Sequence, residues 1–216
     1  MLGLPKTTEF NKRIPKQKFY ENLSVTPAQK KLFAEQIKVI YWRNKIAATT
    51  VNLAPGENVT ELEVFEILLN QPHMDEAVLT QIDRALPYHI LFVLTYNDKQ
   101  QACIAYKEAT ASGGYAFKVL KYYKTGWMPA AQMELEFAGR SLDAVYENYV
   151  RQIAGKKIEA TAAGNLQTDV ERSERKRQLQ KQIDDFQAKI RKEKQFNRQV
   201  ELNAEVKRLQ KMLSEV

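Results

Sequence analysis

Residues 88–96 read YHILFVLTY, and the polar triplet NDK follows directly at 97–99. This is the most hydrophobic strand-like run in the chain, and such runs are typical of strands buried on both faces of a sheet. The NDK triplet predicts a tight hairpin turn, after which residues 102–106 form the next strand. The stretch therefore predicts a sheet at the core, with residues 88–96 at its centre.

Working outward from this stretch, strand-like and helix-like patterns alternate irregularly along the chain. Thr26 and Pro27 form a helix start, with an N-cap followed by a proline at the first helical position, and Ser141 caps a later amphipathic helix. We predict an α+β fold, with a mixed or antiparallel sheet of about five strands flanked by helices. The further predicted strands are 49–53, 60–69, 115–123 and an edge strand at 133–137, and the predicted helices are 27–44, 74–86 and 142–153.

The composition changes sharply at Gly155, and residues 169–216 contain neither Gly nor Pro. We predict a linker at 155–168 and a C-terminal coiled-coil helix at 169–216, joined to the globular core. Two sets of apolar residues there follow a 4, 3, 4 spacing, and the second begins 23 rather than 21 residues after the first. Either one continuous helix turns its apolar face, which the lack of Gly and Pro favours, or the chain forms a hairpin near 195–197. The apolar residues are Leu179, Ile183, Phe186, Ile190, Leu202, Val206, Leu209 and Leu213.

The 216 residues carry a net charge of +7, which is unevenly distributed. Residues 1–45 hold ten basic and three acidic side chains, residues 46–155 eight and thirteen, and residues 156–216 fifteen and ten. We therefore predict a basic N-terminal arm at 1–25, a globular domain at 26–154 and a basic C-terminal segment. The two basic parts are either solvated surfaces or contacts for a polyanion or an acidic protein.

One cysteine and two histidines exclude a disulfide scaffold and leave little for a His- or Cys-based metal centre. The apolar runs are too short to span a bilayer, and the first residues lack the apolar core of a signal peptide. We expect a cytoplasmic protein that does not associate with a membrane and that binds neither a metal nor a cofactor. His73, His89 and Cys103 are not predicted to be catalytic, and His89 is expected to be a core or edge histidine.

A metal-dependent nuclease of the restriction type requires an acid on one strand and an acid-x-Lys pair on the next. Glu61, Glu63 and Glu66 lie on one predicted strand, but residues 88–96 and 102–106 contain no such pair. A degenerate nuclease site around these glutamates is therefore an alternative interpretation only, and no catalytic residue is predicted.

Nucleic-acid binding has somewhat more support, because residues 117–127 interleave lysines with aromatic rings. The same pattern is also expected of an ordinary strand with lysines on its solvent face. Any DNA contact would be to the backbone, since no base-reading motif is present. The candidate nucleic-acid-binding residues are Lys12, Arg13, Lys16, Lys18, Arg43, Lys45, Lys118, Lys121, Lys124 and Trp127.

Several segments resemble a known family nearly end to end: LGLPK (2–6), NKRIPK (11–16), YWRNKI (41–46), ILF (90–92), AYKE (105–108), DAVYENYVRQI (143–153) and KQFNRQVELN (194–203). The chain is similar to the bacterial domain-of-unknown-function family 4391. The resemblance implies a gene that lies near the genes of DNA methyltransferases and helicases in restriction-like phage-defence clusters. It supplies no catalytic residues.

These observations lead to one main hypothesis about function. The protein is expected to be a non-catalytic accessory subunit that assembles, through the eight apolar C-terminal residues, with itself or with a helicase or methyltransferase partner. DNA contact through the basic arm would be secondary. A degenerate nuclease and a stand-alone nucleic-acid-binding protein are the alternatives.

Overall fold

The computed structural model describes residues 2–21, 25–109, 117–161 and 164–216. The chain divides into two compact units, Met1–Gly155 and Lys156–Val216, which we call the sheet domain and the hairpin. None of the described helices is long and apolar enough to cross a membrane.

The α+β prediction is confirmed. The strands are β1 Glu9–Ile14, β2 Ile37–Ala47, β3 Glu61–Leu69, β4 His89–Tyr96, β5 Lys99–Ala109, β6 Phe117–Lys124 and β7 Met128–Pro129, and the helices are α1 Lys18–Glu21, α2 Pro27–Gln36, α3 Glu76–Arg84, α4 Leu142–Ala154, α5 Leu166–Lys192 and α6 Phe196–Ser214.

The sheet is mixed, with strand order β1-β2-β3-β4-β5-β6, and β7 pairs with β5. β3 and β4 are parallel because α3 connects them as a crossover, whereas all the other pairs are antiparallel. The first six residues of β4 are buried. The prediction that residues 88–96 form a central strand is therefore confirmed.

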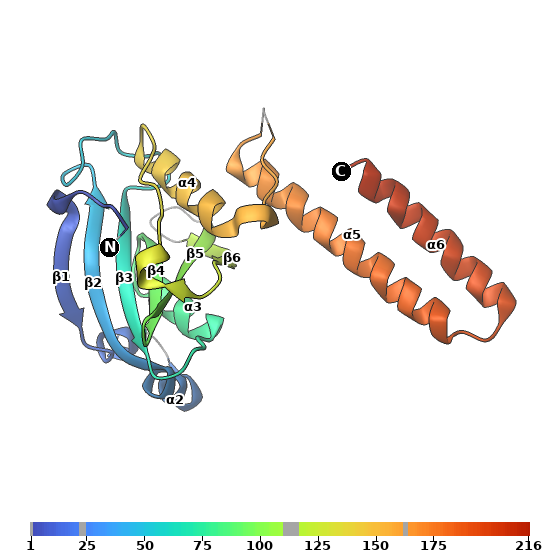
Figure 1. The fold of residues 1–216 in the computed structure, drawn as a ribbon, viewed down its shortest axis with the longest axis horizontal. Coiled ribbons are helices and arrows are strands. Elements are labelled where there is room, and N and C mark those ends of the chain that lie inside the picture. Colours follow the sequence, from blue (N-terminus) through green and yellow to red (C-terminus); the bar gives the residue numbers. More distant parts are fainter. Residues whose placement is uncertain (1, 22–24, 110–116, 162–163) are drawn as a thin grey trace. The chain divides into compact units, whose positions relative to one another are not determined.

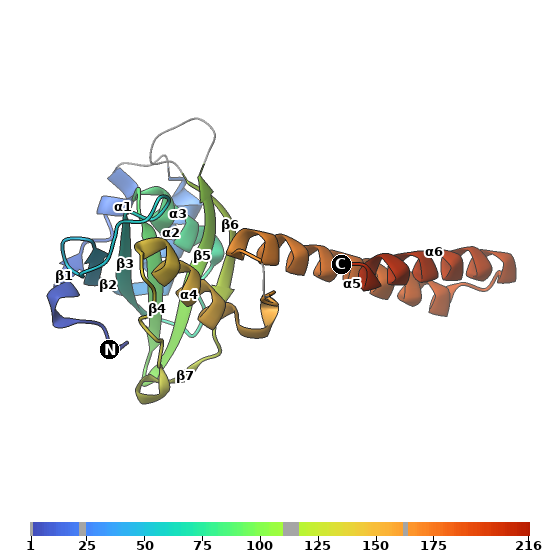
Figure 2. The same ribbon diagram turned by 90° about the horizontal axis from the view of Figure 1, so that it is seen from above.

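Helices cover both faces of this sheet (Figure 2). α2 and α3 lie on one face, which we call the α3 face, and its core includes Phe33, Phe65, Leu79 and Phe92. α4 covers the opposite face, which we call the α4 face, and contacts β3, β5 and β6. Ser141 caps α4 by accepting a hydrogen bond from the amide of Ala144, as its sequence predicts.

The predicted helix 27–44 is wrong beyond Gln36. Thr26 does form the predicted helix start, within a capping box, but from Ile37 the chain continues as β2. The β-branched and aromatic run from Val39 to Trp42 suits a strand, and pairing with β1 and β3 fixes it there. The apolar spacing that suggested a longer helix therefore comes from two adjoining elements.

The predictions at the sheet's edges also need correction. The segment 1–25, predicted to be an arm, supplies β1, an exposed edge strand whose polar sequence carries little strand signal. No strand forms at 49–53 or 133–137, although the short strand β7 lies nearby. The strand predicted at 115–123 corresponds to β6, and residues 115 and 116 lie outside the described part of the chain.

The C-terminal segment is a helical hairpin rather than the favoured continuous helix. α5 and α6 lie side by side and antiparallel (Figure 1). Glu193 makes the break without Gly or Pro: its backbone is extended, and its carboxylate accepts hydrogen bonds from the amides of Lys194 and Gln195 at 2.8 and 2.9 Å. These bonds, at the start of a helix, lower the pKa of Glu193. The shift in heptad register arises because the two apolar sets belong to two helices that face each other.

Candidate functional site

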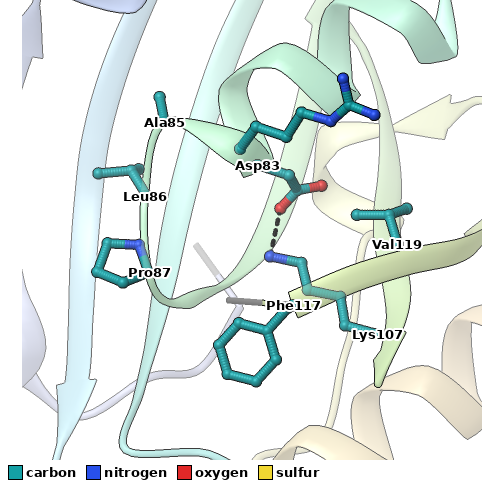
Figure 3. Close-up of a pocket in the computed structure, with 8 residues that line it drawn as sticks. Asp83, Ala85, Leu86, Pro87, Lys107, Phe117 and Val119 are labelled. Atoms are coloured by element: carbon teal, nitrogen blue, oxygen red, sulfur yellow. Dashed lines mark ion pairs between the residues drawn. The ribbon is translucent and has the colours of Figure 1, made fainter. Parts of the chain in front are cut away.

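A pocket of about 480 Å³ opens on the α3 face of the sheet domain (Figure 3). Asp83, near the end of α3, and Lys107, near the end of β5, point toward each other within it. The remaining lining comes from the last residue of α3, from the loop that follows it and from β6. It consists of Arg84, Ala85, Leu86, Pro87, Phe117 and Val119.

Asp83 and Lys107 form a buried ion pair, with 2.6 Å between Lys107 Nζ and Asp83 Oδ1. Their side chains are only 0% and 1% exposed, and burial raises the pKa of Asp83 while the lysine opposes the rise. The Tyr122 hydroxyl also donates to Asp83, and Lys107 Nζ donates to the carbonyl of Tyr88 at 2.8 Å. The pair thus ties α3, β5, β6 and the start of β4 together, which is a structural role.

His89 lies beside this network, on the α4 face. Its ring packs against Phe117 and Tyr146, with ring centroids 4.6 and 4.4 Å away. Burial and the nearby Lys107 charge lower the pKa of His89 to about 3. His89 is therefore a neutral core histidine, as predicted from its apolar strand.

A second, smaller pocket of about 260 Å³ lies next to the first, and Ala85 and Leu86 line both. We call it the Glu63 pocket. Trp42 Nε1 donates to Glu63 Oε2 at 2.6 Å, whereas Oε1 is buried and has no hydrogen-bond partner among the described residues. Its complete lining is Ile14, Lys18, Phe19, Trp42, Glu63, Phe65, Ala85, Leu86 and Tyr88.

Desolvation raises the pKa of Glu63 to about 8. The hydrogen bond from Trp42 opposes this rise, while the neighbouring Glu61 adds to it. Glu61 is itself paired with Lys45, whose Nζ lies 2.9 Å from Glu61 Oε2. The raised pKa favours an uncharged carboxylic acid in the pocket at neutral pH, which sequence reasoning did not anticipate.

The three glutamates of the nuclease alternative do not come together. Glu61 and Glu63 lie on the α3 face, but Glu66, an odd number of residues further along β3, lies on the α4 face. There Glu66 Oε2 accepts two hydrogen bonds from Arg43, at 2.6 and 2.7 Å. Within the described ranges, no group of three or more His, Cys, Asp or Glu is placed to hold a metal ion.

The predicted nucleic-acid-binding residues fall on both edges of the sheet. Lys12 and Arg13 are on β1, Arg43 and Lys45 are on β2, and the lysines of β6 lie at the opposite edge. Several are already engaged: Arg43 with Glu66, Lys45 with Glu61, Lys124 with Glu76 and Lys16 with the carbonyl of Ile37. Lys18 lines the Glu63 pocket, Lys118 and Lys121 lie on β6, and Trp127 packs against the core. The structure thus does not gather these residues into one patch.

The predicted partner-binding residues pack against one another inside the hairpin. Leu179, Ile183, Val206 and Leu209 form its buried cluster, which we call the seam. Phe186, Ile190 and Leu213 pack around it, and Leu202 is also buried.

Sequence reasoning missed two apolar residues that the hairpin leaves exposed. Phe196 and Val200 on α6 are 75% and 52% exposed. The sequence contained a signal for this second apolar face. Phe196 and Val200 are four residues apart, so they share one face of a helix, and they do not belong to the 4, 3, 4 spacing of the predicted partner-binding residues. Of the large hydrophobic residues in the described ranges, only Leu120 is also exposed, and at 43% it is less exposed than either.

Comparison with known proteins places the whole chain in one family. The model of a family described as "Domain of unknown function (DUF4391)" matches residues 2–213. The chain belongs to this family. The match to DUF4391 covers nearly all of both the sheet domain and the hairpin, so both lie within the family's domain. No curated protein and no solved structure matches the chain.

Proposed function

We propose that this DUF4391 protein is an accessory subunit that docks on a protein partner through the outward face of its hairpin. The observation that supports this is the exposure of Phe196 and Val200, which share one face of α6. Val200 precedes the buried Leu202 by two residues, so it lies about 200° away from it around the helix. The pair therefore faces away from the seam and is not needed to hold the hairpin together.

The charge near this pair indicates the chemistry of the partner. Residues 189–198, KIRKEKQFNR, contain five basic side chains and one acidic side chain. Two copies of such a surface would repel each other, whereas an acidic groove with an apolar floor would complement it. The proposed partner is a helicase or methyltransferase of a restriction-like defence system, a class that rests on the neighbourhood implied by the family resemblance.

The test measures, by titration calorimetry, binding of the full chain to a helicase and to a methyltransferase of a restriction-like defence system from the same genome. We expect Phe196→Asp combined with Val200→Asp to weaken binding at least about tenfold, which is the effect of losing two apolar contacts. Circular dichroism should show unchanged helix content, since neither residue lies in the seam. Leu120→Asp, at an exposed apolar position in the sheet domain, is the control.

Three outcomes would overturn the proposal. One is unchanged binding by the double variant. Another is assembly of the chain only with itself in light scattering. The third is binding to duplex DNA alone, with an affinity that falls steeply with salt, which would favour the nucleic-acid-binding alternative. The nuclease alternative stays a prediction, tested by metal-dependent cleavage that is lost in Glu63→Ala and Glu66→Ala.

A further inference from the structure

We propose that the Glu63 pocket binds the base of a nucleotide, with a ring nitrogen next to an exocyclic amino group as the recognised edge. This inference is independent of the hairpin and of the partner proposed above. It rests on the pocket's size, its aromatic walls and a buried polar group that lacks a partner.

The walls of the pocket suit a flat ring. Phe19, Trp42, Phe65 and Tyr88 line it, and they come from four separate parts of the sheet domain. Aromatic side chains stack on any base, because every base has a π-face. The volume of about 260 Å³ is below the range of pockets for drug-sized ligands, so a single ring system fits better than a larger molecule.

The polar group in the pocket is the Glu63 carboxyl, and its residue is 1% exposed. Trp42 satisfies Oε2, while Oε1 has no hydrogen-bond partner within the described part of the chain. A buried oxygen without a partner is costly. In the neutral acid the proton lies on Oε1, because Oε2 accepts from Trp42, so an acceptor on a ligand would remove that cost. Orphaned buried polar atoms in an otherwise apolar pocket are the groups expected to orient a ligand.

The protonation state of Glu63 defines which edge it recognises. The groups that face it are Glu61, Lys45, Lys18 and Tyr88. Desolvation and Glu61 outweigh Lys45 and Trp42, so the raised pKa favours the neutral acid at pH 7. A neutral carboxyl donates through its O–H and accepts through its other oxygen. Adenine and cytosine offer the complementary acceptor and donor side by side, whereas uracil offers no amino group.

Lys18 extends this recognition to the phosphate. It lines the same pocket and is exposed, so its ammonium group can reach a phosphate outside the pocket while the ring lies within it. A lysine acts on phosphate as a mobile point charge. The expected ligand is therefore a nucleotide, free or at the end of a strand, rather than a bare ring.

The test is a fluorescence titration of the full chain with AMP, CMP, UMP and ribose 5-phosphate. It uses a Trp127→Phe background, so that Trp42, a wall of the pocket, is the only tryptophan. We expect AMP or CMP to quench the fluorescence of Trp42 and to bind at least about tenfold more tightly than UMP. This ratio of dissociation constants corresponds to the loss of about one hydrogen bond. Ribose 5-phosphate should not quench it. Absence of quenching by all nucleotides at millimolar concentration would overturn the proposal, as would equal binding of ribose 5-phosphate.

Variants separate the roles within the pocket. Glu63→Leu should remove the preference over UMP, while Glu63→Gln, which also pairs a donor with an acceptor, should keep it. Lys18→Gln should weaken binding of the nucleotide but not of the corresponding nucleoside. Glu66→Gln changes a buried carboxyl on the opposite face of the same strand and should bind like the parent protein. If Glu63→Leu is folded by circular dichroism and keeps the preference, Glu63 is not the recognising group.

Discussion

The sheet domain and the hairpin are stabilised in different ways. The sheet domain has cores on both sheet faces, and the buried Asp83–Lys107 pair links four of its elements, α3, β4, β5 and β6. The hairpin buries one seam of four residues between two helices, and its remaining surface is largely charged. A single change should therefore spread through the sheet domain but stay local in the hairpin. Both tryptophans, Trp42 and Trp127, lie in the sheet domain, so tryptophan fluorescence reports on that unit alone.

The largest effect is expected from breaking the buried ion pair. Lys107→Met leaves the Asp83 carboxylate buried without its cation, which should cost about 3–5 kcal/mol of unfolding free energy. Urea unfolding followed by tryptophan fluorescence measures this loss. Adding Asp83→Asn to Lys107→Met should recover much of it, because no uncompensated charge then remains. A loss below about 1 kcal/mol in the single variant would show that the pair is not a structural anchor.

A smaller effect is expected from the seam of the hairpin. Ile183→Ala removes one of its four buried side chains and should destabilise the hairpin by about 2–3 kcal/mol. On heating, the variant should lose its ellipticity at 222 nm at a lower temperature than the parent protein, while the transition seen by tryptophan fluorescence keeps its midpoint. An equal shift of both transitions would contradict the independence of the two units.

The two units should also respond to pH with opposite signs. The pKa of Glu63 is about 8 in the folded sheet domain, against an ordinary value of 4.5, so the folded state holds this proton more tightly. Its contribution to stability is present at low pH and is lost as the pH rises from 4.5 through 8, at up to about 1.4 kcal/mol per pH unit. Glu63→Gln, uncharged throughout, should flatten this slope in urea unfolding.

In the hairpin, the amides of Gln195 and Lys194 lower the pKa of Glu193. Its contribution is therefore present above 4.5 and is lost as the pH falls through the lowered pKa. Glu193→Gln should reduce the loss of ellipticity on acidification and leave tryptophan fluorescence unchanged.

For Glu63, the contradicting result is a sheet domain that gains stability from pH 5 to pH 8 in the parent protein but not in Glu63→Gln. That result would show that the sign for Glu63 is wrong.

The sequence predicted those elements whose signals are local. Residues 88–96 carry their burial in their own composition, and Thr26 and Ser141 mark helix starts by their side-chain chemistry. β1 was not predicted, because an edge strand such as EFNKRI is exposed and is fixed only by its pairing with β2. The hairpin turn was predicted only as the less favoured alternative, since it depends on the capping by Glu193 rather than on Gly or Pro.

The candidate sites were harder to predict than the fold, because they depend on contacts between distant residues. Lys107 meets Asp83 only after α3 packs on the sheet. Glu63 acquires its raised pKa only when β2 and the loop after α3 enclose it. The seam residues were recognised by their spacing, but spacing alone did not show that α5 and α6 would bury them against each other. This is why the exposed Phe196 and Val200 replace them as the proposed contact.

The smallest expected effect comes from two matched helix caps, one in each unit. Ser141 accepts from the amide of Ala144 at 3.3 Å and Asn165 from that of Thr168 at 2.9 Å, and replacing either by Ala should cost about 1 kcal/mol. Ser141→Ala should lower the urea midpoint seen by fluorescence, whereas Asn165→Ala should move only the ellipticity. Glycine at either position should cost less than alanine, since it is the better N-cap. If each cap variant moves both signals equally, the sheet domain and the hairpin unfold as one cooperative unit, and the proposed difference in how mutations spread does not hold.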